Sequence, residues 1–473
     1  MPFAAYSTLL RSRRHQLHAR ITATLEDRFP EIVLAQPELA ALHATEAGLA
    51  EKAVVYRLEA GQQAFTRSAM LEAVAQLRKG LDVLAGLPDS PWRQQYELDL
   101  QAALGSALMA TKGWSAADVS ETFARARALA EQTDRPGYLV RLIAGQFNFH
   151  FVRAEYTLAL RLAEQLEKIG EARNDAAVQL LGRAFCGNCH FIIGDLVSAR
   201  RALERCVALA DPAHRTLEGL SFDPHSLTLT WLALTLAYLG YVDQARSRMN
   251  EAVSKARRLG HAHSLAHALL FLLWLDWITG SPTEYQEALE LTREHDFPHY
   301  LGWALLHQGR SLVARGQAEE GLAVLTRSLE VLRATGNGVS LPMLFSSLAE
   351  ACAALGQHDE EQRWFDEMAE VIETTGERVS EAEVLHRVRG DLLNLKGDRA
   401  GAERCYQEAI AVAKRQDGNL LQLRASISLA RLWRDQGKRA EARGLLAPVY
   451  NWFIEGLDTP VLKQAKALLE ELG

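Results

Sequence analysis

Residues 309–325 read GRSLVARGQAEEGLAVL, and this stretch contains the pattern that decides the fold. Gly316 separates two segments rich in good helix formers, which indicates a turn between two helices. A small residue stands seven residues before this turn and another, Gly321, five residues after it, while the large Leu325 follows nine residues after it. Small residues let two helix backbones approach closely, and large ones fill the spaces between neighbouring helices. The stretch therefore predicts a tightly packed helix pair.

The same turn returns along the chain at a nearly constant interval. Successive turn glycines are 46, 40, 36, 40, 41 and 40 residues apart, at Gly194, Gly240, Gly280, Gly316, Gly356, Gly397 and Gly437. Further steps of about 40 residues towards the N-terminus reach Arg153 and Gly113. A period in this range indicates helix pairs that stack on their neighbours. We therefore expect an all-α solenoid with a period of about 40 residues.

Other glycines and prolines mark where helices end. In four copies a second glycine follows the second helix, where a left-handed C-terminal cap favours glycine: Gly260, Gly336, Gly376 and Gly418. The longest interval contains Asp211-Pro212 and Asp223-Pro224, and we expect a surface loop there. No alternating apolar and polar run predicts a strand.

The small, small, large pattern around a glycine turn resembles the tetratricopeptide repeat. The resemblance covers residues from about Leu98 to Leu472. The period exceeds the usual 34 residues, so each helix would carry roughly one additional turn. The resemblance implies a right-handed superhelical solenoid of helix pairs, in which the first helix of each pair lines a concave groove.

We predict two regions in the chain. Residues 1–90 form an irregular N-terminal helical region, which begins with a helix over residues 6–29. Residues 91–473 form the repeat array. The break between them is the double-proline segment Leu87-Pro88-Asp89-Ser90-Pro91.

The N-terminal stretch Tyr6–Ile21 resembles a junction in bacterial multidomain signalling proteins. In those proteins a class III adenylate or guanylate cyclase domain precedes a predicted ATPase, and helical repeats end the chain. Residues 37–49 and 428–450 share this resemblance, which implies that the chain corresponds to the C-terminal regulatory region alone. The sequence contains no Gly-x-x-x-x-Gly-Lys-Ser/Thr phosphate loop. We therefore expect no enzyme activity, and the resemblance implies cyclase or ATPase domains encoded elsewhere as partners.

Composition excludes several classes of function. The net charge of −7 and the pI of about 6.1 argue against a nucleic-acid-binding protein, although the first helix has a basic cluster from Arg11 to Arg20. That cluster is a nucleic-acid or membrane arm, a solvated helix face or a contact with an upstream domain that the sequence lacks. The longest apolar run, Ala268–Leu275, is too short to span a bilayer. An odd number of cysteines and the absence of a signal-peptide pattern favour the cytoplasm.

Two local motifs invite a metal or haem interpretation. Cys186-Gly187-Asn188-Cys189-His190 matches a haem-attachment motif, but Gly187 occupies the small position of the repeat, and buried cysteine behaves as a small apolar residue. His263 and His267 stand one helical turn apart and could chelate a metal, or they could be polar residues at a helix start. We expect neither a metal nor another cofactor.

The concave groove is the candidate site. By analogy with ordinary repeats, its exposed positions lie 13, 10, 6 and 3 residues before each turn. An aromatic centre beside a cationic end suits an extended protein or peptide segment. Alternatively, the longer repeat shifts the register and buries the tryptophans as core. The candidate groove residues are Phe147, His150, Asn188, Phe191, His267, Trp274, Trp277, Trp303, Arg310, Arg387, Asp391, Asn394, Arg424, Arg431 and Arg434.

The sequence thus predicts a non-catalytic helical-repeat module for protein interaction or effector sensing, with a regulatory role in signalling. One alternative is a truncated part of a cyclase–ATPase protein that acts with catalytic domains encoded elsewhere. Another is the repeat region of a transcription activator, which would need a helix-turn-helix module that neither end of the sequence shows.

Overall fold

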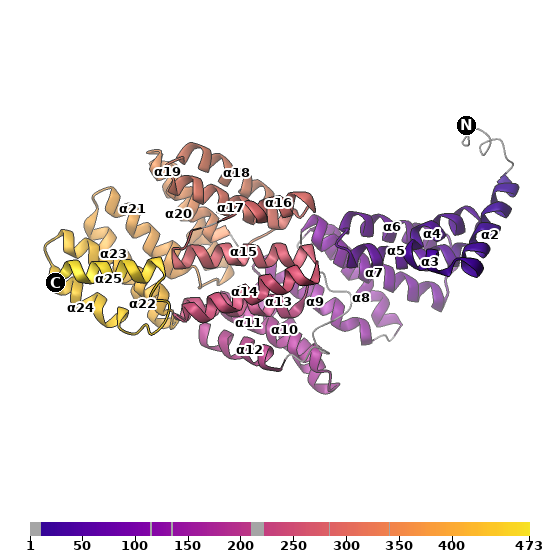
Figure 1. The fold of residues 1–473 in the computed structure, drawn as a ribbon, viewed down its shortest axis with the longest axis horizontal. Helices are drawn as coiled ribbons and strands as arrows, with labels where there is room; N and C mark the ends of the chain where they lie inside the picture. The colour runs from indigo at the N-terminus through magenta and orange to yellow at the C-terminus, as the bar shows by residue number, and fades with distance from the viewer. Residues whose placement is uncertain (1–10, 114–115, 134–135, 210–221, 283, 340) are drawn as a thin grey trace. The chain divides into compact units, whose positions relative to one another are not determined.

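A computed structural model describes residues 11–113, 116–133, 136–209, 222–282, 284–339 and 341–473. The described residues form helices joined by turns, and no strand occurs among them (Figure 1). The predicted all-α solenoid is confirmed. The described residues divide into two compact units: unit 1 comprises those up to residue 112 and those between 116 and 146, and unit 2 comprises residue 113 and the described residues from 147 to 473. The predicted change from irregular to regular helix pairs at residue 90 stays a prediction.

Unit 1 contains the N-terminal helices. They are α2 (Arg11–Arg28), α3 (Pro30–Ala35), α4 (Pro37–Glu46), α5 (Ala50–Thr66), α6 (Met70–Ala85), α7 (Pro91–Lys112), α8 (Ala117–Gln132) and the first part of α9 (Pro136–Val152). Helix α2 covers most of the helix predicted over residues 6–29, and residues 6–10 lie outside the described part. The double-proline break separates α6 from α7, whose first residue is Pro91, as suits a residue without a backbone N–H.

Unit 2 contains the rest of α9 and the regular helix pairs. Their elements are α10 (Tyr156–Ala172), α11 (Ala176–Ile192), α12 (Leu196–Leu209), α13 (Pro224–Leu239), α14 (Val242–Leu259), α15 (Ala262–Thr279), α16 (Gln286–Glu294), α17 (Pro298–Ala314), α18 (Ala318–Ala334), α19 (Leu341–Ala354), α20 (His358–Thr375), η2 (Glu381–Val388), α21 (Arg389–Leu395), α22 (Arg399–Arg415), α23 (Asn419–Asp435), α24 (Arg439–Tyr450) and α25 (Pro460–Leu472). Of the predicted loop, Asp211-Pro212 lies outside the described residues, and Asp223 caps α13 by accepting a hydrogen bond from the Ser226 backbone N–H.

Packing within each pair follows the small and large positions of the repeat. A Cβ atom on Gly309 would lie only 2.6 Å from Cγ of Leu325, which is nine residues after the turn. The equivalent contacts join Gly187 to Leu203 at 2.7 Å and Gly390 to Tyr406 at 2.6 Å. Real Cβ atoms do not tolerate such distances, so the glycines set how closely the two helices approach.

The turns also match the pattern, with two corrections. The eight turn glycines, including Gly113, have φ between +72° and +102°. Of the glycines predicted to end second helices, Gly260, Gly336 and Gly376 are left-handed as expected. At Gly418 the prediction is wrong: its φ is −81°, and Asp417 takes the left-handed position with φ +55°. In the repeat without a turn glycine, the left-handed turn residue is Ala154 rather than Arg153, and its φ is +62°.

The first helix of one pair begins as a π-helix. Element η2 has π-helical geometry over eight residues and continues into α21. It lies in the interval between Gly356 and Gly397, which is 41 residues long. Because π-helical hydrogen bonds span one residue more than α-helical bonds, this geometry accommodates an inserted residue without moving the turn. Such elements are frequent at functional sites.

Later helix pairs of unit 2 fold back onto earlier ones. The last carbonyls of successive first helices lack partners within their own helix, and residues four to five repeats later in the chain satisfy them. Two bonds are donated by side chains, across 180 and 146 residues of sequence. The bonds are Gly338 N to Val152 O at 2.7 Å, Arg378 N to Ile192 O at 3.0 Å, Asn419 Nδ2 to Leu239 O at 3.0 Å and Arg424 Nη1 to Ile278 O at 3.0 Å. These contacts close the interior of unit 2.

Helix α15 is long and apolar enough to cross a membrane, but 83% of it is buried within the protein. Its apolar surface therefore packs against neighbouring helices, as expected of a core helix in a solenoid.

Candidate functional site

The predicted groove residues separate into three groups in unit 2. The first group lies in or beside an aromatic cavity and consists of Phe147, Asn188, Phe191, His267, Trp274 and Trp303. The second lines or supports an arginine-lined cavity and consists of Trp277, Arg310, Arg387, Asp391 and Arg424. The third lies in neither cavity and consists of His150, Asn394, Arg431 and Arg434.

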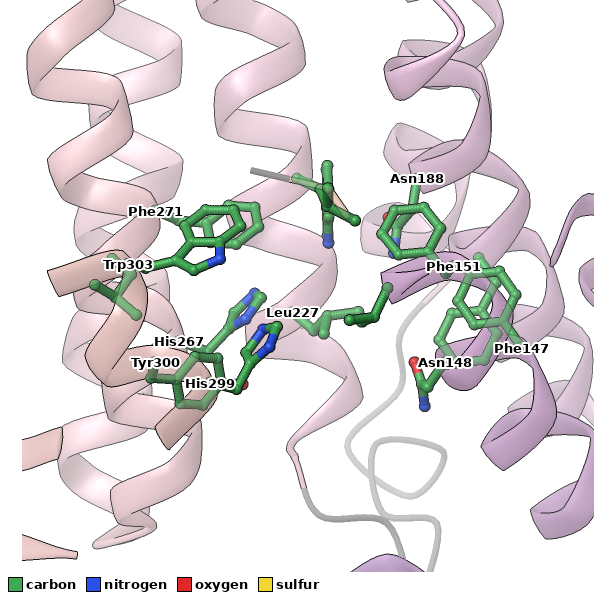
Figure 2. A pocket seen from close by; sticks show the side chains of 15 residues that line it. Phe147, Asn148, Phe151, Asn188, Leu227, His267, Phe271, His299, Tyr300 and Trp303 are labelled. Carbon is green, nitrogen blue, oxygen red and sulfur yellow. The ribbon is translucent and has the colours of Figure 1, made fainter. Parts of the chain in front are cut away.

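The aromatic cavity is small and mostly apolar, with a volume of about 60 Å³. Figure 2 shows Trp303, Phe271 and Tyr300 on one side and Phe147 and Phe151 on the other. The rings pack closely around it, and Phe147 stacks on Phe185 with their centroids 3.8 Å apart. Val339 completes the lining beside the bond from Gly338 to Val152. The contact between early and late pairs therefore helps to enclose this space.

The polar groups of the aromatic cavity are uncharged. Burial lowers the pKa of His267 to about 3, with a contribution from His299, and burial lowers the pKa of His299 to about 3 as well. Two buried donors at the cavity, Asn148 Nδ2 and Trp303 Nε1, have no hydrogen-bond partner among the described residues. The cavity thus suits a small apolar group that brings hydrogen-bond acceptors with it.

Several predicted groove residues are buried rather than exposed. The exposed fractions are 0% for Phe191, 3% for Trp274 and 6% for Trp303, and Phe147 is equally inaccessible at 1%. Trp274 Nε1 donates to the Tyr238 hydroxyl at 3.1 Å. The expectation that these positions face an open groove is therefore wrong. The physical reason is that aromatic side chains of nearby first helices fill the inner face that ordinary repeats leave exposed: the centroid of the Trp274 ring lies 5.8–5.9 Å from those of Phe191, Phe271 and Trp303.

The arginine-lined cavity is larger and more polar, with a volume of about 880 Å³. Its lining comes from the first helices α15, α17, α19, η2 and α23, some of them far apart in sequence, and from residues at and before the start of α16. The residues that carry its charge or hydrogen-bonding capacity include Trp277, His307, Arg310, Glu350, Arg387 and Arg424. Sequence reasoning missed His307 and Glu350, although Glu350 stands six residues before Gly356, as Arg310 does before Gly316.

Two of the cavity arginines are already paired with a buried carboxylate. Glu383 on η2 is 2% exposed and accepts from Arg387 Nη2 at 2.6 Å and from Arg424 Nη2 at 2.7 Å. Burial alone would raise the pKa of Glu383, but the two guanidinium groups lower it to about 2. Asp391 accepts a further bond from Arg387 and one from the Tyr406 hydroxyl at 2.7 Å. Arg387 and Arg424 therefore fix η2 and α23 in place.

Arg310 differs from its two neighbours. Its guanidinium carbon lies 4.0 Å from the centroid of the Trp277 ring, and its buried Nη1 atom has no hydrogen-bond partner among the described residues. Burial lowers the pKa of Arg310 to about 10, which leaves it cationic at neutral pH. His307 is 2% exposed and its Nε2 also lacks a partner in the described part of the chain. Burial and the charge of Arg310 lower the pKa of His307 to about 3.

Glu350 is one of two glutamates that line this cavity, and the other is Glu284. Burial raises the pKa of Glu350, and the charges of Arg310 and Arg387 oppose this increase. Within the described residues no ion pair joins Glu350 to either arginine. The cavity therefore contains a cation and a carboxyl group that do not bond each other, and this arrangement suits a ligand with groups for both.

The third group does not converge on one place. His150 Nδ1 pairs with Glu155 Oε2 at 2.5 Å, and Arg434 Nη1 bonds Glu471 Oε2 at 2.6 Å. Asn394 and Arg431 are exposed. A role of these four residues in binding stays a prediction.

The sequence motifs that suggested haem or metal are packed into the core. Cys189 is inaccessible, and burial raises the pKa of Cys186 to about 12, which disfavours a thiolate. His263 is 1% exposed and its ring lies 4.9 Å from that of Tyr300. Among the described residues, no group of three or more His, Cys, Asp or Glu side chains is placed to hold a metal ion.

Comparison with known proteins places this geometry in a family. The sequence profile described as "MalT-like TPR region" matches residues 187–452, more than half of the chain. The chain belongs to the MalT-like TPR region family. The predicted tetratricopeptide-like character is thereby confirmed, and the association with cyclase and ATPase domains stays a prediction. Both cavities have most of their lining within the matched TPR region.

One relative of this TPR region is "Uncharacterized protein R02095" of Rhizobium meliloti (strain 1021), with 26% identity over 445 residues. The alignment covers 90% of this chain and 42% of the relative, so the chain spans less than half of that protein's length. A similar solved structure is a Rap protein complexed with Competence and Sporulation Factor, with TM-score 0.54, 12% identity and coverage of 77% of this chain and 99% of that chain. The apo quorum sensor NprR from B. thuringiensis gives a TM-score of 0.45 at 12% identity, over 76% of this chain and 97% of that chain.

Proposed function

We propose that unit 2 is a non-catalytic module that recognises a protein or peptide segment and has a regulatory role in signalling. Membership of a TPR family supports this role, because such arrays work through their surfaces. The Rap protein with a similar fold is described in complex with a factor, which supports recognition of a partner by this architecture. We place the binding site at the arginine-lined cavity.

The observation that carries this proposal is the unpartnered Nη1 atom of Arg310. A buried donor on a charged group costs free energy unless something accepts its hydrogen bond. Arg387 and Arg424 have their acceptor in Glu383, whereas Arg310 stacks on Trp277 with that nitrogen unused. A partner that supplies an acceptor would gain a charge-assisted hydrogen bond.

Affinity capture tests the proposal with three versions of the full chain. Wild-type protein, Arg310→Gln and Arg431→Gln are each used to capture partners from cells of the source organism. Arg431 is the control because it is a predicted groove residue that is exposed and lies in neither cavity. We expect Arg310→Gln alone to lose the partner while circular dichroism shows unchanged helicity. Equal capture by all three versions would refute a site at this cavity.

A second candidate function comes from the resemblance of residues 6–21 to a junction in cyclase–ATPase proteins, and the length of the relative agrees with it. R02095 is more than twice as long as the aligned part of this chain, so the proposed module corresponds to part of a larger protein there. We propose that the chain regulates cyclase or ATPase domains that are encoded separately. The purified chain should then form no cyclic nucleotide from ATP or GTP, and measurable product would contradict the non-catalytic proposal.

A further inference from the structure

The inner side of α17 carries a row of buried nitrogen atoms that no described residue satisfies. They are Trp303 Nε1, His307 Nε2 and Arg310 Nη1, at spacings of four and three residues along the helix. Residues at these spacings lie on one face of an α-helix. Trp303 lines the aromatic cavity, whereas His307 and Arg310 line the arginine-lined cavity. The row therefore leads from one cavity to the other along a single helix.

Helix α17 is a rigid support for this row. A Cβ atom on Gly302 would lie 2.6 Å from Cγ of Leu332, and Ser328 Oγ donates to the Gly302 carbonyl at 2.7 Å. Together with the contact of Gly309 with Leu325, these interactions hold α17 against α18 at two points seven residues apart. The three nitrogen atoms are thus presented in a fixed order, which reduces the entropy that a ligand must lose on binding.

The chemistry of the row identifies the kind of ligand. The Trp303 indole and the Arg310 guanidinium can only donate, and a guanidinium matches a carboxylate best. His307 is neutral and either donates or accepts through Nε2. Glu350 offers an acceptor within the same cavity. A peptide supplies this combination, because its main chain alternates carbonyl and N–H groups and it ends in, or carries, a carboxylate.

The dimensions fix the length of the peptide. Arg310 follows Trp303 by seven residues, which is a distance of about 10 Å along the helix axis at about 1.5 Å per residue. An extended peptide covers about 3.3 Å per residue, so about three residues follow the row. The aromatic cavity measures about 60 Å³, well below the roughly 150 Å³ of a cavity known to hold benzene. It therefore accepts a small aliphatic side chain better than an aromatic one.

We propose that α17 binds an extended peptide of about three residues, with a carboxylate on Arg310, main-chain groups on His307 and Trp303, and a small aliphatic side chain in the aromatic cavity. This inference rests on the proposed function and adds the class of ligand, its direction and its length. The carboxylate comes either from the C-terminus of the peptide or from an aspartate or glutamate side chain. Both sources present the same chemistry to Arg310.

The test uses the full chain and three matched sets of N-acetylated tripeptides. The first set ends in a free carboxylate, the second contains the same sequences as C-terminal amides, and the third contains amides whose last residue is Asp or Glu. Binding is measured by affinity selection and then by isothermal titration calorimetry. We expect carboxylate-bearing peptides with Ala or Val at the first position to bind at least tenfold more tightly than the neutral amides. Stronger binding of the third set than of the first assigns the carboxylate to a side chain.

Variants separate this inference from a general loss of binding. Arg310→Gln should abolish the tenfold preference for a carboxylate. Trp303→Phe removes one hydrogen-bond donor, the indole N–H, and should lower the affinity for all the bound peptides by about 3- to 10-fold. Arg431→Gln is the control, because Arg431 is an exposed arginine that lies in neither cavity. Equal binding of acids and amides, or a preference that survives Arg310→Gln, would overturn the inference. Absence of tripeptide binding while Arg310-dependent partner capture persists would overturn it too, and would leave the proposed function intact.

Discussion

The two cavities of unit 2 are built from the same repeat position and yet differ in character. Trp274 and Arg310 each stand six residues before a turn glycine. Trp274 is 3% exposed and packs among aromatic rings beside a cavity of about 60 Å³. Arg310 lines a cavity of about 880 Å³ and has a nitrogen atom without a partner in the described chain. The repeat determines which side chains turn inwards, and the side chains that they meet in the interior determine whether they become core or line an open cavity.

The largest effect is expected from a tryptophan of the aromatic cavity. Trp231 is 4% exposed and its ring lies 4.8 Å from that of Phe271. We expect Trp231→Ala to lower the free energy of unfolding by about 3–5 kcal/mol, because the surrounding rings cannot refill the space. Chemical denaturation of Trp231→Ala and of Trp277→Ala, whose tryptophan lines the arginine-lined cavity, compares the two cavities. Equal losses in the two variants would show that both cavities are core.

The next effect tests whether the paired arginines of the second cavity are structural. Glu383→Gln leaves two buried guanidinium groups without their carboxylate, and we expect a loss of about 3 kcal/mol in the free energy of unfolding. We choose the lower end of the usual range because the side chains of Arg387 and Arg424 keep 13% and 15% exposure. Denaturation that is unchanged from wild type would mean that the cluster does not hold η2 and α23 together.

Acid titration of the same variant sharpens this result. The folded pKa of Glu383 is about 2, below the unfolded value of about 4.5. The unfolded state therefore binds the proton first, and the stabilisation is complete above about pH 4.5 and lost as the pH falls towards 2. Over that window the wild type should lose more stability than Glu383→Gln does. If the stability of wild type and of Glu383→Gln changed equally with pH over this window, the pairing of Glu383 with Arg387 and Arg424 would be contradicted.

A smaller effect is expected from a buried carboxyl group that forms no ion pair within the described part of the chain. Glu377 is 1% exposed and bonds Ser380 and Tyr156, and burial raises its pKa to about 8. The folded state keeps the proton that the unfolded state releases, so stability falls as the pH rises from about 4.5 to 8. Between pH 6 and 8 we expect this carboxyl group to lower the free energy of unfolding of the wild type by about 2 kcal/mol. The Glu377→Gln variant should lack this decrease. Thermal unfolding at each pH measures it, and identical profiles would refute the raised pKa.

The smallest change in stability is expected at Arg310. Its Nη1 atom makes no hydrogen bond to the described residues, so Arg310→Gln removes a buried charge and gives up only the contact with Trp277. We expect the free energy of unfolding to change by less than about 1 kcal/mol in either direction. Urea denaturation of Arg310→Gln and of Glu383→Gln measures the difference between the two variants. If Arg310→Gln loses as much free energy of unfolding as Glu383→Gln does, Arg310 is a structural residue.

The helix pairs could be predicted from the sequence because their contacts are local. Gly309 and Leu325 meet within one pair, and the spacing that joins them is visible in the chain. Contacts between distant pairs carry no such periodic signal. Asn419 reads as an ordinary first residue of a helix, although it caps the carbonyl of Leu239. Trp274 is buried by ring contacts with Phe191 and Trp303 on other first helices, and the spacing before a single turn does not reveal these contacts.

The candidate site shows the same limit. The offsets from each turn find Arg310 and Trp277, because both lie on the inner face that the repeat defines. They do not show that Arg424 returns to the same cavity to bond Glu383 and Ile278. The π-helical start of η2 left a weak signal, a single extra residue in the interval before Gly397.

The most direct test measures the affinity of the captured partner for wild-type protein and for Arg310→Gln under conditions in which both are folded. If the arginine-lined cavity is the recognition site, the dissociation constant should rise at least tenfold in the variant while the unfolding curve stays in place. An unchanged dissociation constant would contradict the account and would assign recognition to another surface of the chain.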